Sequence, residues 1–110
     1  MPGDDYFKIV YLILSELYEA MKKGREVDFK SISKDYLKIP EEYLLEIWAS
    51  ILEKGYTKGY SVREVGRNIY ISGIANAKIT MDGVEYLESN SMMKKIYETI
   101  KEAKSWIPGL

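Results

Sequence analysis

The sequence predicts an α+β fold, a winged helix built from a helix-turn-helix and a β-hairpin wing, with an added C-terminal helix. Three observations predict it. Apolar residues follow helical spacing in the first half of the chain, a strand-type composition replaces it near residue 56, and helical spacing returns near residue 80. Since no linker or repeat interrupts the 110 residues, we predict a single winged-helix domain over 1–110.

The first helix is predicted over residues 4–23. Acidic residues at its start and lysines at its end suit the helix dipole, and Gly24 provides a residue that closes a helix readily. Apolar residues recur every three or four positions and predict the buried face. They are Tyr6, Ile9, Val10, Ile13, Leu14, Leu17 and Met21.

A helix-turn-helix is predicted next. Residues 27–39 indicate a brief second helix, with Asp28 or Ser31 as its cap. Pro40 suits the first position of a third helix over 40–54, which Gly55 ends. The residues expected to face inward are Phe29, Ile32, Tyr36 and Leu37 from the second helix and Leu44, Ile47, Trp48 and Ile51 from the third.

The second half of the chain predicts the wing and two more helices. Segments 56–65 and 68–72 have strand-type composition, with a Gly-Arg-Asn turn at 66–68 between them. Thr80 can cap a short helix, which Gly83 would enter tightly and which carries Val84 and Leu87. A last helix follows over 91–107, as a C-terminal extension of the domain.

The segments near the C-terminus resemble a known family. Residues 79–91 read ITMDGVEYLESNS, and residues 95–107 read KIYETIKEAKSWI. Together they resemble the C-terminal half of the YjcQ-like family, small winged-helix proteins of Gram-positive bacteria and their prophages. The likeness extends to the first helix and to the strand segment at 68–71. The chain departs from the family at Pro40 and Ser89. The resemblance implies a fold and a phage association, and it carries no activity.

Composition excludes many kinds of chemistry. The chain has no Cys and no His, which excludes disulfides, thiolate nucleophiles, Ser-His triads and Cys- or His-ligated metals. It also has no phosphate-binding glycine loop and no calcium loop. We therefore expect a protein that is not an enzyme and that uses no cofactor and no metal. Without a signal peptide or a membrane span, we expect a cytoplasmic protein with no membrane partner.

The net charge of −1 hides an uneven distribution of charge. Residues 56–80 hold four basic side chains and one acidic one, a local charge of +3. In a winged helix these side chains would contact DNA phosphate or enter a minor groove. The alternative is an ordinary charged hairpin. The candidate nucleic-acid-binding residues are Lys58, Arg63, Arg67 and Lys78.

The third helix has the opposite charge. Residues 41–55 hold four Glu and one Lys, a local charge of −3. Helices that read a DNA groove normally present basic or amide side chains, so this face suits a protein partner better than DNA. A solvated helix face is the alternative reading. The candidate partner-binding residues are Glu42, Glu46, Ser50 and Glu53.

Two further surfaces are open to more than one interpretation. The last helix can pair two copies of the chain or fold back on the first helix. Tyr43, Tyr60 and Tyr70 can form a stacking surface or line the rim of the core. The candidate dimer residues are Met92, Met93, Ile96, Ile100 and Trp106.

These observations leave two hypotheses for function. The first is a non-catalytic, DNA-associated or regulatory protein of phage or prophage type. The second is a module that binds a host or phage protein through the acidic third helix or the C-terminal helix. DNA, a protein partner and a second copy of the chain are therefore the candidate partners.

Overall fold

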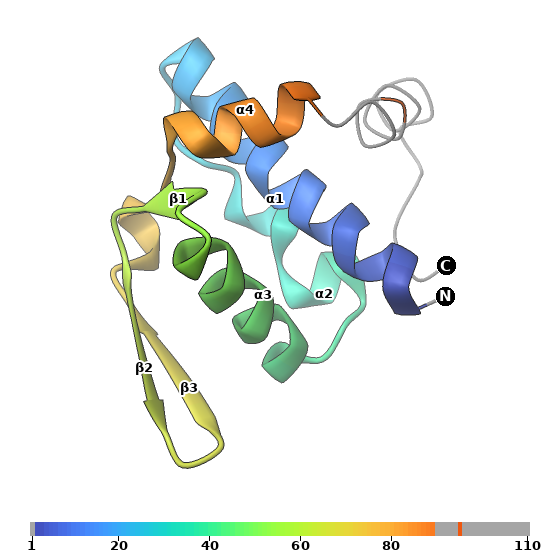
Figure 1. Cartoon of the computed structure of the whole chain (residues 1–110), viewed down its shortest axis with the longest axis vertical. Coiled ribbons are helices and arrows are strands. Elements are labelled where there is room, and N and C mark those ends of the chain that lie inside the picture. Colours follow the sequence, from blue (N-terminus) through green and yellow to red (C-terminus); the bar gives the residue numbers. More distant parts are fainter. Residues whose placement is uncertain (1, 90–94, 96–110) are drawn as a thin grey trace.

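The computed structural model describes residues 2–89 and Lys95, and it shows an α+β, winged-helix-like arrangement (Figure 1). Helix α1 (Pro2–Lys23) is followed by a 3₁₀ turn (Phe29–Ile32), α2 (Lys34–Leu37) and α3 (Glu41–Glu53). The hairpin of β2 (Ser61–Val65) and β3 (Asn68–Ser72) extends beside α3. Helix α4 (Met81–Ser89) lies against α1. The predicted C-terminal helix lies outside the described residues.

The core lies where α1, α2 and α3 meet the short strand β4 (Lys78–Ile79) and α4. Helix α1 contributes the most to it, because four of its side chains are at most 2% exposed. The inner face of α3 carries Ile47, Trp48 and Ile51, as its spacing predicts. The largest fully buried side chains are Ile9, Ile13, Leu14, Leu17, Leu37 and Ile47. Met21 departs from the predicted stripe, since it lies in the last turn of α1 and is 54% exposed.

The segment predicted as a helix-turn-helix begins with only one turn of α-helix, α2. Ser33 caps α2 by accepting a hydrogen bond from the backbone N–H of Tyr36 at 3.2 Å. Of the two predicted caps, Asp28 lies at the N-cap of the 3₁₀ turn without a side-chain cap hydrogen bond, and Ser31 lies inside that turn. Tyr36 was expected to face inward but is 44% exposed, because so short a helix buries only Leu37. Pro40 lies at the N-cap of α3 rather than at its first helical position.

The predicted strand over 56–65 divides into two at Gly59. β1 (Thr57–Lys58) pairs antiparallel with β4 (Lys78–Ile79), whereas β2 pairs with β3. Gly59 has φ 95°, and a Cβ there would lie 2.1 Å from the carbonyl oxygen of Asn76. No other residue fits so close a backbone approach, so the chain bends here and the hairpin leaves the body of the molecule.

Candidate functional site: the groove between helix α3 and the wing

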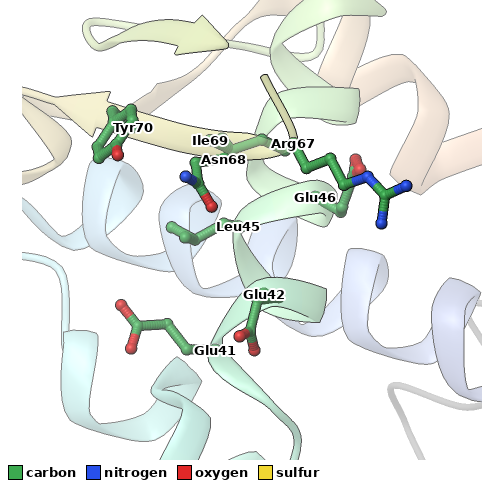
Figure 2. Close-up of a pocket in the computed structure, with 8 residues that line it drawn as sticks. All are labelled: Glu41, Glu42, Leu45, Glu46, Arg67, Asn68, Ile69 and Tyr70. Atoms are coloured by element: carbon green, nitrogen blue, oxygen red, sulfur yellow. The ribbon is translucent and has the colours of Figure 1, made fainter. Parts of the chain in front are cut away.

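The predicted acidic helix and the predicted basic wing line one groove. Its volume is about 400 Å³, and Figure 2 shows the first turn of α3 at one end and β3 at the other. We call it the α3–wing groove. Its lining residues are Glu41, Glu42, Leu45 and Glu46 from α3, and Arg67, Asn68, Ile69 and Tyr70 from the wing.

The position of these glutamates follows from the periodicity of α3. With Ile47, Trp48 and Ile51 buried, the opposite face of the helix must carry Glu42 and Glu46, which are four residues apart and exposed. Glu41 and Glu42 also occupy the first helical turn, where the helix dipole favours negative charge. One face of α3 therefore holds the core and the other presents carboxylates to the wing.

The groove is more acidic than basic. Among residues 2–89, three carboxylates line it against the guanidinium of Arg67, and Leu45 and Ile69 supply apolar surface between them. Within residues 2–89, no ion pair joins Arg67 to these carboxylates. The groove thus presents free carboxylates beside apolar surface, an arrangement that attracts cations and repels phosphates.

The four predicted wing cations fall into two groups. Arg63 and Arg67 belong to the hairpin, and the Arg63 guanidinium lies 5.7 Å from the centre of the Tyr70 ring. Lys58 and Lys78 lie outside the hairpin, directly opposite each other on β1 and β4. The bend at Gly59 separates the two groups, so the four side chains do not form one patch.

The predicted face of α3 also divides. Glu42 and Glu46 line the α3–wing groove, whereas Ser50 and Glu53 line a second cavity of about 700 Å³ near the end of α3. Aromatic side chains from α1 and α4 dominate this second cavity. Tyr56 and Tyr86 stack there with ring centres 4.8 Å apart, and burial together with these neighbours raises the pKa of Tyr86. Its aromatic lining residues are Tyr6, Phe7, Tyr56 and Tyr86.

The three tyrosines considered for a stacking surface are not together. Tyr60 is 8% exposed and belongs to the core, whereas Tyr70 is 48% exposed on the wing. Tyr43 is half-buried and lies 6.3 Å from Tyr6, measured between ring centres. Sequence periodicity could not separate these cases, since each contact joins distant parts of the chain.

Three further predictions concern metal binding, membrane spans and a dimer surface. Across residues 2–89 and Lys95, no group of three Asp, Glu, His or Cys side chains is placed to hold a metal ion. No helix in this same part of the chain is long and apolar enough to span a membrane. The predicted dimer residues, Met92, Met93, Ile96, Ile100 and Trp106, lie outside the described residues.

Comparison with known proteins identifies the family. The family model described as YjcQ protein matches residues 11–106. The chain is similar to "Uncharacterized protein YjcQ" from Bacillus subtilis (strain 168), with 28% identity over 100 residues. The match covers 91% of this chain and 95% of that relative. No solved structure matches the chain. Because the family model spans most of its length, the chain belongs to the YjcQ family.

Proposed function

We propose that this protein is a non-catalytic interaction module whose α3–wing groove binds a basic segment of a partner protein. The observation that carries the proposal is the lining of that groove, in which Glu41, Glu42 and Glu46 stand beside apolar surface. By the resemblance to prophage proteins, the partner is a host or phage protein and the role a regulatory one.

The charge of α3 argues against DNA as the ligand of this groove. Helix-turn-helix proteins place the second helix of the motif in the major groove, next to phosphates. Here that helix would bring Glu42 and Glu46 to the DNA, and both are exposed. Carboxylates there would be repelled by the phosphate backbone, which supplies much of the affinity in such complexes.

The lining of the groove also indicates which kind of ligand it would bind. A carboxylate pair four residues apart on a helix suits an arginine or lysine side chain. Leu45 and Ile69 between the charged groups suit the aliphatic part of that side chain or an apolar neighbour. A short segment with two basic residues and one apolar residue meets both requirements.

The test is fluorescence anisotropy with a labelled peptide rich in Arg and Leu. Wild-type protein should bind this peptide, and Glu42→Gln with Glu46→Gln should weaken binding about tenfold. Glu85→Gln with Glu88→Gln removes two exposed carboxylates from α4 and is the matched control. Equal affinity for the two double variants would overturn the proposal.

A second candidate function, DNA association through the wing, is favoured by the two arginines of the hairpin. Arg63 and the exposed Tyr70 lie opposite each other on β2 and β3, and Arg67 lies at the turn. These side chains can contact phosphate without α3 entering a groove. Arg63→Ala with Arg67→Ala should lower the salt slope of duplex DNA binding by about one unit per lost phosphate contact. A wild-type protein that does not bind duplex DNA at low salt would exclude this function.

A further inference from the structure

We infer a second binding site, on a different surface from the α3–wing groove, that takes an acidic amphipathic helix from a partner protein. The site is a groove of about 750 Å³ between the end of α1 and the β1–β4 sheet. We call it the α1–β4 groove. Its apolar lining includes Leu17, Ala20, Met21, Val27, Phe29 and Ile79.

Two lysines at this groove face each other across the sheet. Lys58 and Lys78 are direct partners in the β1–β4 register, and both are exposed. Direct cross-strand neighbours have Cβ atoms about 5 Å apart, and like charges in that position destabilise a sheet. Within residues 2–89, neither lysine forms an ion pair. A bound carboxylate would relieve their repulsion.

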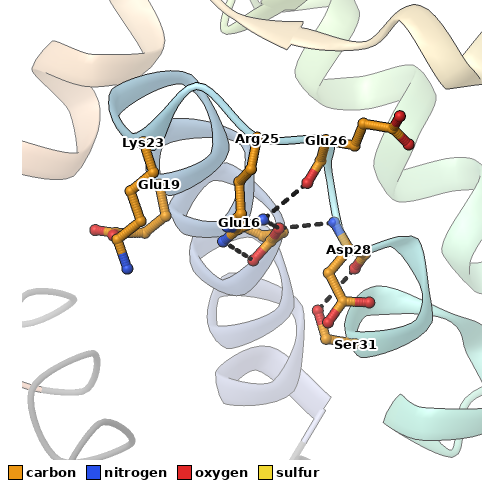
Figure 3. A network of polar contacts seen from close by, with 7 residues as sticks. All are labelled: Glu16, Glu19, Lys23, Arg25, Glu26, Asp28 and Ser31. Atoms are coloured by element: carbon orange, nitrogen blue, oxygen red, sulfur yellow. Dashed lines mark hydrogen bonds and ion pairs between the residues drawn. The ribbon is translucent and has the colours of Figure 1, made fainter.

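A network of polar contacts holds the wall of the groove in place. Arg25 donates to Glu16 at 2.6 and 3.2 Å, and the same carboxylate accepts a hydrogen bond from the backbone N–H of Asp28 at 2.8 Å (Figure 3). The hydrogen bonds to Glu16 raise the pKa of Arg25. Because Glu16 neutralises Arg25, the two lysines are the cations left to bind a ligand. Glu26 is a carboxylate in the lining, and Figure 3 shows its side chain pointing away from Glu16 and Arg25.

The apolar lining selects a peptide over a nucleic acid. Met21 is 54% exposed, and Val27 and Phe29 are half-buried, so a ligand must bring an apolar face to cover them. A phosphate backbone would satisfy the lysines and leave this surface in water. On a helix, side chains four residues apart have Cβ atoms about 5–6 Å apart, which matches the spacing of the two lysines. An acidic amphipathic helix therefore fits both features.

The experiment uses the full chain and a labelled 15-residue helical peptide with Leu on one face and Glu pairs at i and i+4. We expect the peptide to bind in fluorescence anisotropy at low salt. Lys58→Gln with Lys78→Gln should weaken binding about tenfold, as should a peptide with Gln in place of Glu. Lys34→Gln with Lys38→Gln, which removes exposed lysines at the start and just after the end of α2, should leave the affinity unchanged.

A charge exchange and a polar substitution complete the test. The variant Lys58→Glu with Lys78→Glu should no longer bind the Glu peptide and should bind a peptide with Lys in place of Glu. Met21→Ser should lower the affinity for the Glu peptide. An affinity that does not change in Lys58→Gln with Lys78→Gln would overturn the inference. The inference would also be overturned if duplex DNA bound the wild-type protein and bound the variant Lys58→Gln with Lys78→Gln more weakly, while the affinity for the peptide stayed the same. The surface would then bind nucleic acid.

Discussion

Tyr60 joins three segments of the chain through one hydroxyl group. The hydroxyl donates a hydrogen bond to the carbonyl oxygen of Trp48 at 2.7 Å and accepts one from Thr57 at 2.6 Å. The Tyr60 ring packs edge-on against Trp48, with ring centres 5.4 Å apart. This tyrosine therefore fixes the start of the wing to helix α3.

Replacing Tyr60 with Phe should lower the free energy of unfolding by about 1–3 kcal/mol, because the buried Thr57 hydroxyl loses its acceptor and the Trp48 carbonyl loses a second donor. Burial raises the pKa of Tyr60 to about 12, from 10.0. The folded protein therefore holds this proton more tightly than the unfolded chain. The resulting stability is complete below pH 10 and is lost as the pH rises towards 12.

Urea unfolding at neutral pH and between pH 9 and about 11.5 checks this prediction. The wild-type protein should lose more stability over the alkaline range than Tyr60→Phe does. The control is Tyr70→Phe, since Tyr70 is 48% exposed on the wing. Parallel curves for wild type and Tyr60→Phe would contradict the assignment.

Gly83 allows α4 to approach the end of α3. A Cβ at this position would lie 2.3 Å from the carbonyl oxygen of Tyr56 and 2.7 Å from the Ile79 side chain. Gly83→Ala should therefore lower the free energy of unfolding by about 1–3 kcal/mol. Gly24→Ala is the control. A Cβ at Gly24 would have no atom within 4 Å, so this variant measures only the loss of stability from a side chain in the left-handed backbone conformation. If Gly83→Ala lost less free energy of unfolding than Gly24→Ala, α4 would be able to move away from Tyr56 at little cost, which would contradict this role of Gly83.

At the scale of elements, Thr80 connects the start of α4 to the end of α3. Its hydroxyl oxygen accepts a hydrogen bond from the backbone N–H of Gly83 at 3.1 Å and donates to the carbonyl oxygen of Gly55. Its own backbone N–H donates to the carbonyl oxygen of Tyr56 at 3.0 Å. One residue therefore caps a helix and anchors it to another.

Removing this connection should destabilise α4 first. We expect Thr80→Ala to lower the free energy of unfolding by about 1–2 kcal/mol, because the helix loses its cap and a carbonyl loses its donor. Thr80→Ser keeps the hydroxyl and should cost much less. Urea unfolding gives the total, and hydrogen exchange of the α4 amides locates the effect. Equal stability of the Ala and Ser variants would contradict the role of the hydroxyl.

Over the whole molecule, a net charge of −1 conceals two surfaces of opposite sign. The α3–wing groove is lined by three carboxylates, whereas the α1–β4 groove is lined by two lysines without ion pairs in the described part of the chain. We therefore expect that ligands of opposite charge bind this small protein at the same time, one in each proposed site. Salt should weaken both interactions, since all these groups are exposed.

The last prediction concerns the C-terminal segment of the chain and the oligomeric state of the protein. We propose that the apolar stripe at Met92, Met93, Ile96, Ile100 and Trp106 pairs two copies of the chain. Ile100→Glu should then convert a dimer to a monomer in light scattering, because a carboxylate cannot be buried without a partner. Lys104→Glu, which changes a charged residue in the same segment, is the control. A wild-type protein that is already monomeric would end this proposal.

The local features of the fold were predictable from the sequence. Helical spacing predicted most core positions of α1 and α3, although not the exposure of Met21, and Thr80 was predicted as a cap. These features depend on residues within one or two turns of each other, so a pattern in the sequence contains them. Likewise, the acidic face of α3 follows from the position of its apolar residues.

Only the tertiary structure decided which of these features meet. It placed Glu42 and Glu46 against the wing, Ser50 and Glu53 beside aromatic residues of α1 and α4, and Lys58 opposite Lys78. It also buried Tyr60 and exposed Met21. Each outcome depends on packing between segments distant in sequence, and spacing along the chain does not specify such contacts. The sequence by itself determined helices α1, α3 and α4, the Thr80 cap and the charges of these helices, whereas the close backbone approach at Gly59 and the packing of α3 against β3 determined the two grooves.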